Sequence, residues 1–201
     1  MKGFQFKING NWAHFKKPDT NNNPLSHDLI PKTALIGMIG AVLGIERKKM
    51  KSLFPQLSED LLYGVELLNP VTKTSCGFTS HTAITPTAIK SPKAFEMLRD
   101  VSYKVCVGLY GERSQSIFDE FQKAIVDGYA VYDPYLGIAN CPAELSFISQ
   151  GEFTMMGNGD FKTKGFVIAN EHKLKIVGDD FRIGFDKVPT YQNNDFWNLP
   201  E

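Results

Sequence analysis

The order of strand-like and helix-like segments restricts this chain more than any other feature of its sequence. Alternating apolar residues, the period of a half-buried strand, occupy residues 4–8, 61–71, 101–109 and 143–149. Apolar residues at helical spacing occupy residues 31–46 and 114–128, with Ser114 or Ser116 before the second helix and Gly128 after it. This order is that of a split βαβ unit. The sequence therefore predicts an α+β, ferredoxin-like (βαββαβ, RRM-like) domain with both helices on one face of an antiparallel sheet.

Two stretches exceed this minimal pattern. Residues 72–100 have little apolar periodicity and are long for a plain connection, so we expect a functional insertion. After residue 150, a hairpin over residues 153–168 and an extended piece over residues 173–191 are expected. Residues 192–201 receive no assignment. The predicted organisation is a domain of residues 1–150 with an insertion at about 72–100, and a C-terminal β-hairpin extension of residues 151–201 packed on it.

The composition predicts the cellular compartment and the state of the cysteines. Hydrophobic residues are 42% and charged residues 22%, as in folded globular proteins. Because no apolar run approaches the roughly 18 residues of a membrane helix and no secretory segment opens the chain, we expect a cytoplasmic protein without membrane contact. Three well-separated cysteines exclude a disulfide framework and a paired Cys-x-x-Cys zinc site, which favours buried free thiols.

The formal net charge is zero, but it is unevenly distributed. Residues 1–54 contain nine basic and three acidic residues, a net charge of +6, which leaves −6 for the remainder. Such asymmetry favours a polyanion on one face and a protein partner on another.

Motifs for metal or cofactor chemistry are missing. The four histidines are far apart and form no metal-ligand spacing. The glycine-rich residues 37–44 lack both the Walker lysine and the dinucleotide fingerprint, and no nucleophile elbow is present. We therefore expect no metal, no cofactor and no catalytic residue of these kinds.

An aromatic and basic cluster is the best candidate for binding. Trp12 and His14 precede Lys16 and Lys17, and a stacking platform beside cations suits single-stranded nucleic acid. A core Trp with a solvated Lys pair explains the same residues equally well.

Two motifs resemble a known family. GNWAHFK (residues 10–16) followed by PKTALIGMIGAVLG (residues 31–44) resembles the N-terminal signature of the fifth Cas family, RAMP-superfamily subunits of type I CRISPR interference complexes (Cascade). YLG (residues 135–137) with CPA (residues 141–143) resembles a second, shorter stretch of that family. The likeness extends loosely to about residue 191, and it is closer to the I-B-type members.

The resemblance implies a non-catalytic RNA-binding subunit of an antiviral complex. Such a subunit holds the 5′ handle of the CRISPR RNA (crRNA), caps the backbone filament, and meets filament subunits, the large subunit and, indirectly, target DNA. It also implies that residues 72–100 form a thumb. The candidate RNA contacts are Trp12 and His14 for base stacking, Lys16, Lys17 and Lys32 for charge, and Asn21, Asn22 and Asn23 for hydrogen bonds to base edges. Thr33 is a candidate at the start of the helix, and Lys73, His81 and Lys90 are candidates in the thumb. Gly37 and Gly40 would permit close approach to the backbone by RNA or by a neighbouring element.

Two alternatives stay open. The family includes metal-independent endoribonucleases that process precursor crRNA, and His14 or His27 with Lys16 or Lys17 are the residue types for that acid-base chemistry, with His81 in the thumb. A ferredoxin-like metabolite binder or oligomer interface would also explain the zero net charge. It would not explain the Asn-rich loop beside Lys16 and Lys17.

Overall fold

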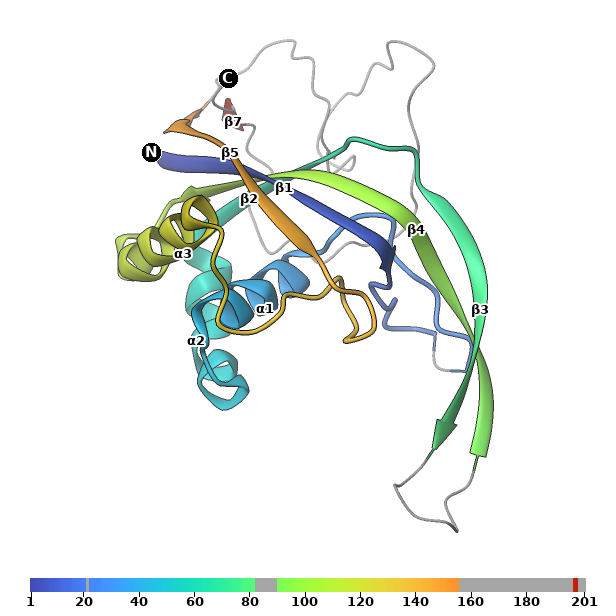
Figure 1. Cartoon of the computed structure of the whole chain (residues 1–201). Coiled ribbons are helices and arrows are strands. Elements are labelled where there is room, and N and C mark those ends of the chain that lie inside the picture. Colours follow the sequence, from blue (N-terminus) through green and yellow to red (C-terminus); the bar gives the residue numbers. More distant parts are fainter. Residues whose placement is uncertain (21, 82–89, 156–196, 199–201) are drawn as a thin grey trace.

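A curled antiparallel sheet with helices on one side forms the body of the protein (Figure 1). The computed structural model describes residues 1–20, 22–81, 90–155 and 197–198. The sheet has the spatial order β2-β4-β1-β5, and β3 pairs with the outer part of β4. Its strands are β1 (Lys2–Ala13), β2 (Leu61–Leu67), β3 (Thr72–His81), β4 (Lys90–Leu109) and β5 (Glu144–Glu152). The helices are α1 (Lys32–Leu43), α2 (Arg47–Asp60) and α3 (Gln115–Asp127), the last preceded by a 3-10 turn, η1 (Glu112–Ser114).

The core lies between the sheet and these helices. Phe4, Phe6 and Ile8 alternate along β1 and are fully buried. The ring of Phe4 meets Phe118 and Phe121 of α3 edge-on, with ring centroids 5.4 Å and 5.6 Å apart. Burying each such side chain stabilises the fold by roughly 1.5–3 kcal/mol, so this aromatic contact fixes α3 on the sheet.

Two helices, and not the single predicted one, lie between β1 and β2. α1 ends before Gly44, which has a φ of 68°, and not near residue 46 as predicted. α2 then begins at Arg47 and was missed. Met50, Leu53, Phe54 and Leu57 have helical spacing, but the exposed, strongly basic start and the proline at position 55 mask this pattern. α3 begins after Ser114 and ends before Gly128 (φ 64°), as predicted.

Residues 72–100 are a long β-hairpin, although their sequence shows little apolar periodicity. β3 pairs with residues 90–99 of β4, from Thr72 opposite Arg99 to His81 opposite Lys90. We call this hairpin the arm; it extends away from the body in Figure 1. The strand predicted at 101–109 thus begins eleven residues earlier, at Lys90, and the strand predicted to reach residue 71 ends at Leu67.

The C-terminal part is described only in two short strands. β6 (Thr154–Met155) pairs with β7 (Trp197–Asn198), which comes from the tail left unassigned by the sequence. The predicted hairpin around residues 157–159 and the extended piece at 173–191 lie outside the described residues. No helix in the described part of the chain has the length and apolar character needed to cross a bilayer.

Candidate nucleic-acid interface

An exposed tryptophan lies beneath an arginine where the arm joins the sheet. Trp12 is paired with Arg99 in the β1–β4 register, and the Arg99 guanidinium carbon lies 5.6 Å from the centroid of the indole. The indole remains 36% exposed. The core interpretation of Trp12 is therefore wrong, and an aromatic ring with an adjacent cation faces solvent.

One residue pair is missing from the β1–β4 ladder at this junction. Gly10 pairs with Val101 and Trp12 with Arg99 in the same register, but Asn11 and Asp100 between them are not paired. Asp100 has a φ of 49°, a left-handed conformation that few residues other than glycine adopt. The unpaired position marks the point at which β4 passes from the sheet into the arm, next to the Trp12 and Arg99 pair.

The loop that carries Lys16 and Lys17 is fastened to the arm. The amide of Glu96 donates to the Pro24 carbonyl (2.9 Å) and the amide of Ala94 donates to Asn23 Oδ1 (3.3 Å). Lys16 faces Ser26 in an isolated bridge, and the Ser26 amide donates to Glu96 Oε1 (3.1 Å). These contacts hold the two lysines beside the arm.

Trp12, Lys16, Lys17 and Arg99 form what we call the arm-base surface. Lys16 and Arg99 are exposed and Lys17 is half-buried. Of the three predicted asparagines, Asn22 is exposed, Asn23 is bound to the arm, and Asn21 lies outside the described residues. The exposed ring is able to stack on a base, and the cations of Arg99, Lys16 and Lys17 are able to attract phosphates.

His14 does not belong to this surface, which corrects its predicted stacking role. Its side chain is 1% exposed, its Nδ1 lies 2.8 Å from the Glu96 carbonyl oxygen, and its ring meets Phe95 edge-on. A base has no access to a ring buried in this way.

The two family-like motifs meet at His14. The His14 amide donates to the Leu136 carbonyl (3.0 Å). Gly137 has a φ of 91°, and a Cβ there would lie 1.9 Å from the His14 carbonyl oxygen. The second motif thus needs glycine at this position because it packs directly on the first.

Lys32 is also unavailable to a phosphate. It is 1% exposed, and its Nζ donates to the Ser58 carbonyl at 2.6 Å, which ties the start of α1 to the end of α2. Burial lowers the pKa of Lys32 to about 8. Its neighbour Thr33 is half-buried. The predicted role of Lys32 as a surface charge is therefore wrong.

Lys73 serves the arm rather than facing a ligand. Its Nζ lies 2.9 Å from Asp28 Oδ1 and 2.9 Å from Glu96 Oε1. Burial alone would lower the pKa of Lys73, but the hydrogen bonds and charges of Glu96 and Asp28 outweigh it and raise the pKa. Two carboxylates thus neutralise this lysine. His81 and Lys90 are exposed and face each other at the opposite end of β3, away from the arm-base surface.

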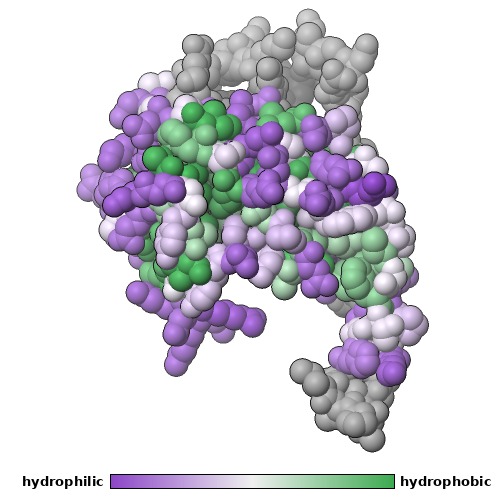
Figure 2. All heavy atoms as spheres, viewed as in Figure 1, coloured by the Kyte–Doolittle hydropathy of each residue, from purple (hydrophilic) through white to green (hydrophobic). Residues whose placement is uncertain are grey.

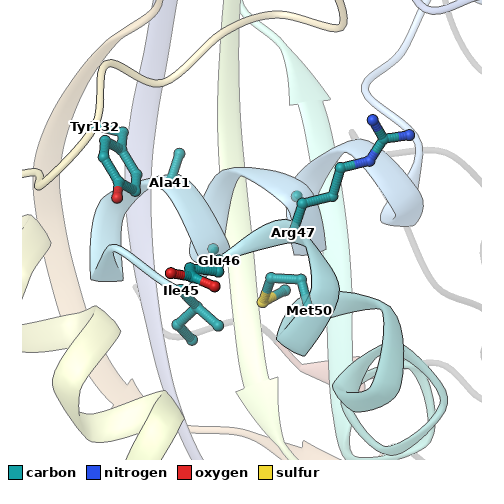
Figure 3. A pocket seen from close by; sticks show the side chains of 8 residues that line it. Ala41, Ile45, Glu46, Arg47, Met50 and Tyr132 are labelled. Carbon is teal, nitrogen blue, oxygen red and sulfur yellow. The ribbon is translucent and has the colours of Figure 1, made fainter.

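The glycines of α1 border a pocket of about 430 Å³ (Figure 3). A Cβ on Gly40 would lie 2.7 Å from Met50 Cγ, so the close approach predicted here is made by α2 of the same chain. A Cβ on Gly37 would meet nothing within 4 Å. The pocket is lined by Gly37, Gly40, Ala41, Ile45, Glu46, Arg47, Met50 and Tyr132.

The two histidines considered for acid-base catalysis are buried, whereas that hypothesis requires them at the RNA-binding surface. His14 and His27 are 1% and 3% exposed, so neither imidazole reaches the ribose of a bound RNA at the surface.

Among the described residues, no group of three His, Cys, Asp or Glu side chains is placed to hold a metal ion. Cys106 and Cys141 are buried free thiols, and burial raises their pKa to about 12 and about 11.

Arg99 was missed by the sequence analysis as a site residue. It lies 87 positions from Trp12, and only the strand register brings the two together. Residues 72–100 show too little apolar periodicity to predict a strand, so no sequence signal indicates this pairing.

One family model matches most of the chain. The family model of CRISPR-associated protein (Cas_Cas5) matches residues 3–163. A comparison with curated proteins finds no match. A chain of a CRISPR RNA-guided surveillance complex shares 18% identity and a TM-score of 0.52, over 69% of this chain and 58% of that one.

Two further solved structures are similar at lower scores. A CRISPR-associated protein shares 15% identity at a TM-score of 0.46, over 74% of this chain and 69% of that one. A CRISPR protein from Archaeoglobus fulgidus shares 13% identity at a TM-score of 0.42, over 77% and 66%. This chain thus spans about three fifths to two thirds of the length of these relatives.

Proposed function

Because the chain belongs to the CRISPR-associated protein (Cas_Cas5) family, we propose that it is the RNA-binding subunit of a type I CRISPR interference complex. In this proposal it holds the 5′ handle of crRNA without cleaving it. The observation that carries the proposal is the arm-base surface, where an exposed indole lies under a guanidinium and the loop that carries Lys16 and Lys17 is fastened to the arm.

The chemistry of a single-stranded handle suits this surface. Unpaired RNA is bound through stacked bases and phosphate contacts, since its bases are not hidden in a duplex. Trp12 offers the stacking ring, and Lys16, Lys17 and Arg99 offer the charge. The fastening of the loop to the arm keeps these groups in place before RNA binds, which reduces the ordering entropy lost on binding.

The proposed fold is ferredoxin-like, with the arm as its thumb. The order β2-β4-β1-β5, with helices after β1 and after β4, supports it. Residues 1–150 would form that domain and residues 151–201 an extension on it. The proposed partners are the filament subunits, the large subunit and, indirectly, target DNA; a relative's description as part of a surveillance complex supports them.

Co-expression with the neighbouring genes tests the proposal. The RNA that co-purifies is sequenced, and the purified chain alone is then incubated with precursor RNA in EDTA. We expect bound RNAs that share one 5′ handle and no cleavage by the isolated chain. Cleavage in EDTA would make the chain the processing ribonuclease, and absence of bound RNA would contradict RNA binding altogether.

A further inference from the structure

The basic residues at the start of α2 take no part in the proposed handle site. Arg47, Lys48, Lys49 and Lys51 are all exposed, and they supply four of the nine basic residues in the positively charged part of the chain. We call these four residues the α2 basic surface. Figure 2 shows hydrophilic side chains projecting from the region where Figure 1 places α2, at a distance from the arm.

Nothing in the described residues neutralises this surface. None of its four cations forms an ion pair there. Glu46 precedes them, but Figure 3 shows its carboxylate and the Arg47 side chain pointing in different directions. Lys73 and Lys104, by contrast, are each paired with carboxylates.

The cations also oppose the helix that carries them. The first turn of α2 contains no acidic residue, and positive side chains at a helix N-terminus are disfavoured by about 0.3–1 kcal/mol each at low ionic strength. Because the cluster stabilises neither the helix nor a contact within the described chain, its charge is available for an external anion.

The composition of the surface selects the kind of anion. Residues 46–52 include no aromatic and no amide side chain, so they offer neither base stacking nor base-edge hydrogen bonds. Their four cations are suited to phosphates, and an exposed aromatic ring, Tyr132, lines the pocket beside Arg47. A duplex displays its phosphates outward and keeps its bases stacked inside, whereas single-stranded RNA is recognised largely through its bases.

We infer that the α2 basic surface binds the phosphate backbone of duplex DNA, independently of base sequence and separately from the arm-base surface. The chain then has two nucleic-acid surfaces of different chemistry. One is aromatic and suited to unpaired RNA, and the other is purely cationic and suited to a duplex.

The test compares two charge-matched variants of the full-length protein. Binding to an arbitrary 20-base-pair DNA is followed by fluorescence anisotropy at several salt concentrations. K48Q/K49Q removes two charges from the α2 basic surface, and K2Q/K123Q removes two exposed charges elsewhere. We expect K48Q/K49Q to weaken duplex binding several-fold and to reduce the slope of log K against log salt by about 1.8, since each phosphate contact contributes about 0.9.

The outcomes separate this inference from the proposed function. With K48Q/K49Q, binding of single-stranded crRNA should stay unchanged, while K16A/K17A should weaken RNA binding and leave duplex binding intact. An equal loss with K2Q/K123Q, an unchanged slope with K48Q/K49Q, or no duplex binding by the wild type would overturn the inference. Release of a protein subunit from the co-expressed complex by K48Q/K49Q, at unchanged duplex affinity, would assign the surface to an acidic protein instead. Circular dichroism and thermal unfolding verify that each variant is folded.

Discussion

At the scale of single residues, the indole of Trp12 is expected to contribute most of the stacking at the arm-base surface. Stacking of a base on an aromatic ring is worth about 1–3 kcal/mol by alanine substitution. Trp12→Ala should therefore weaken binding of single-stranded crRNA by about 5- to 150-fold in an anisotropy titration. Trp12→Phe keeps a ring and should retain most of the affinity.

Thermal unfolding is the control for this pair. Because Trp12 is 36% exposed, neither substitution should abolish folding. An affinity for RNA that is the same in Trp12→Ala as in the wild type would place the stacking site elsewhere.

Lys32 gives a pH dependence of stability. Burial lowers its pKa from 10.5 to about 8. Between pH 8 and 10.5, Lys32 is therefore protonated in a larger fraction of unfolded chains than of folded chains. The free energy of unfolding should therefore gain a contribution that rises with pH across that window. This contribution should disappear in Lys32→Met. Denaturant unfolding of the wild type and the variant at pH 7.5 and pH 10 measures the difference.

The difference between the two proteins isolates this lysine, because their other titrating groups are shared. A wild type and a Lys32→Met variant with the same change in unfolding free energy between the two pH values would contradict the buried position of Lys32.

At the scale of elements, two glycines of α1 form a matched pair. Gly37→Ala meets nothing within 4 Å and should stabilise the protein by about 0.5–1 kcal/mol, since alanine favours a helix over glycine. Gly40→Ala places a methyl group 2.7 Å from Met50 Cγ and should destabilise it by about 1 kcal/mol or more. Denaturant midpoints compare the variants, and equal shifts would contradict the contact between α1 and α2.

The arm depends on the ion pairs of Lys73. Lys73→Met leaves Asp28 and Glu96 without their shared cation, so the loop of residues 14–31 should loosen from the arm. We expect faster hydrogen exchange at the backbone amides of His27 and Glu96. Lys93→Met, also on the arm, is the matched control and should leave these amides protected. Equal protection in both variants would show that the ion pairs do not hold the loop.

Elements with a strong local pattern were predictable, and those defined by pairing or charge were not. α3 has apolar residues at helical spacing between Ser114 and Gly128, and its bounds follow from these residues. α2 has apolar residues at helical spacing, but most of its first two turns are exposed and Pro55 interrupts the pattern, so the helix was not predicted. In the arm, β3 and β4 pair with each other while many of their side chains face solvent, and their sequence therefore shows little of the pattern of a buried strand.

At the scale of the whole molecule, the sequence located the region of the site but not its members. Trp12 is exposed under Arg99, and Lys16 and Lys17 lie in the loop that is fastened to the arm. His14, Lys32 and Lys73 share the same residue chemistry, yet each is drawn inward by a specific partner. Composition cannot separate these cases, because burial depends on contacts between segments that are far apart in sequence.

The salt dependence of RNA binding tests the central claim most directly. Anisotropy titrations of single-stranded crRNA with the wild type and with K16A/K17A, at salt concentrations from 50 to 300 mM, give the slope of log K against log salt. The account predicts weaker binding and a slope reduced by about 1.4, since each phosphate contact to a single strand contributes about 0.7. An unchanged slope and affinity in K16A/K17A would contradict the assignment of RNA binding to the arm-base surface.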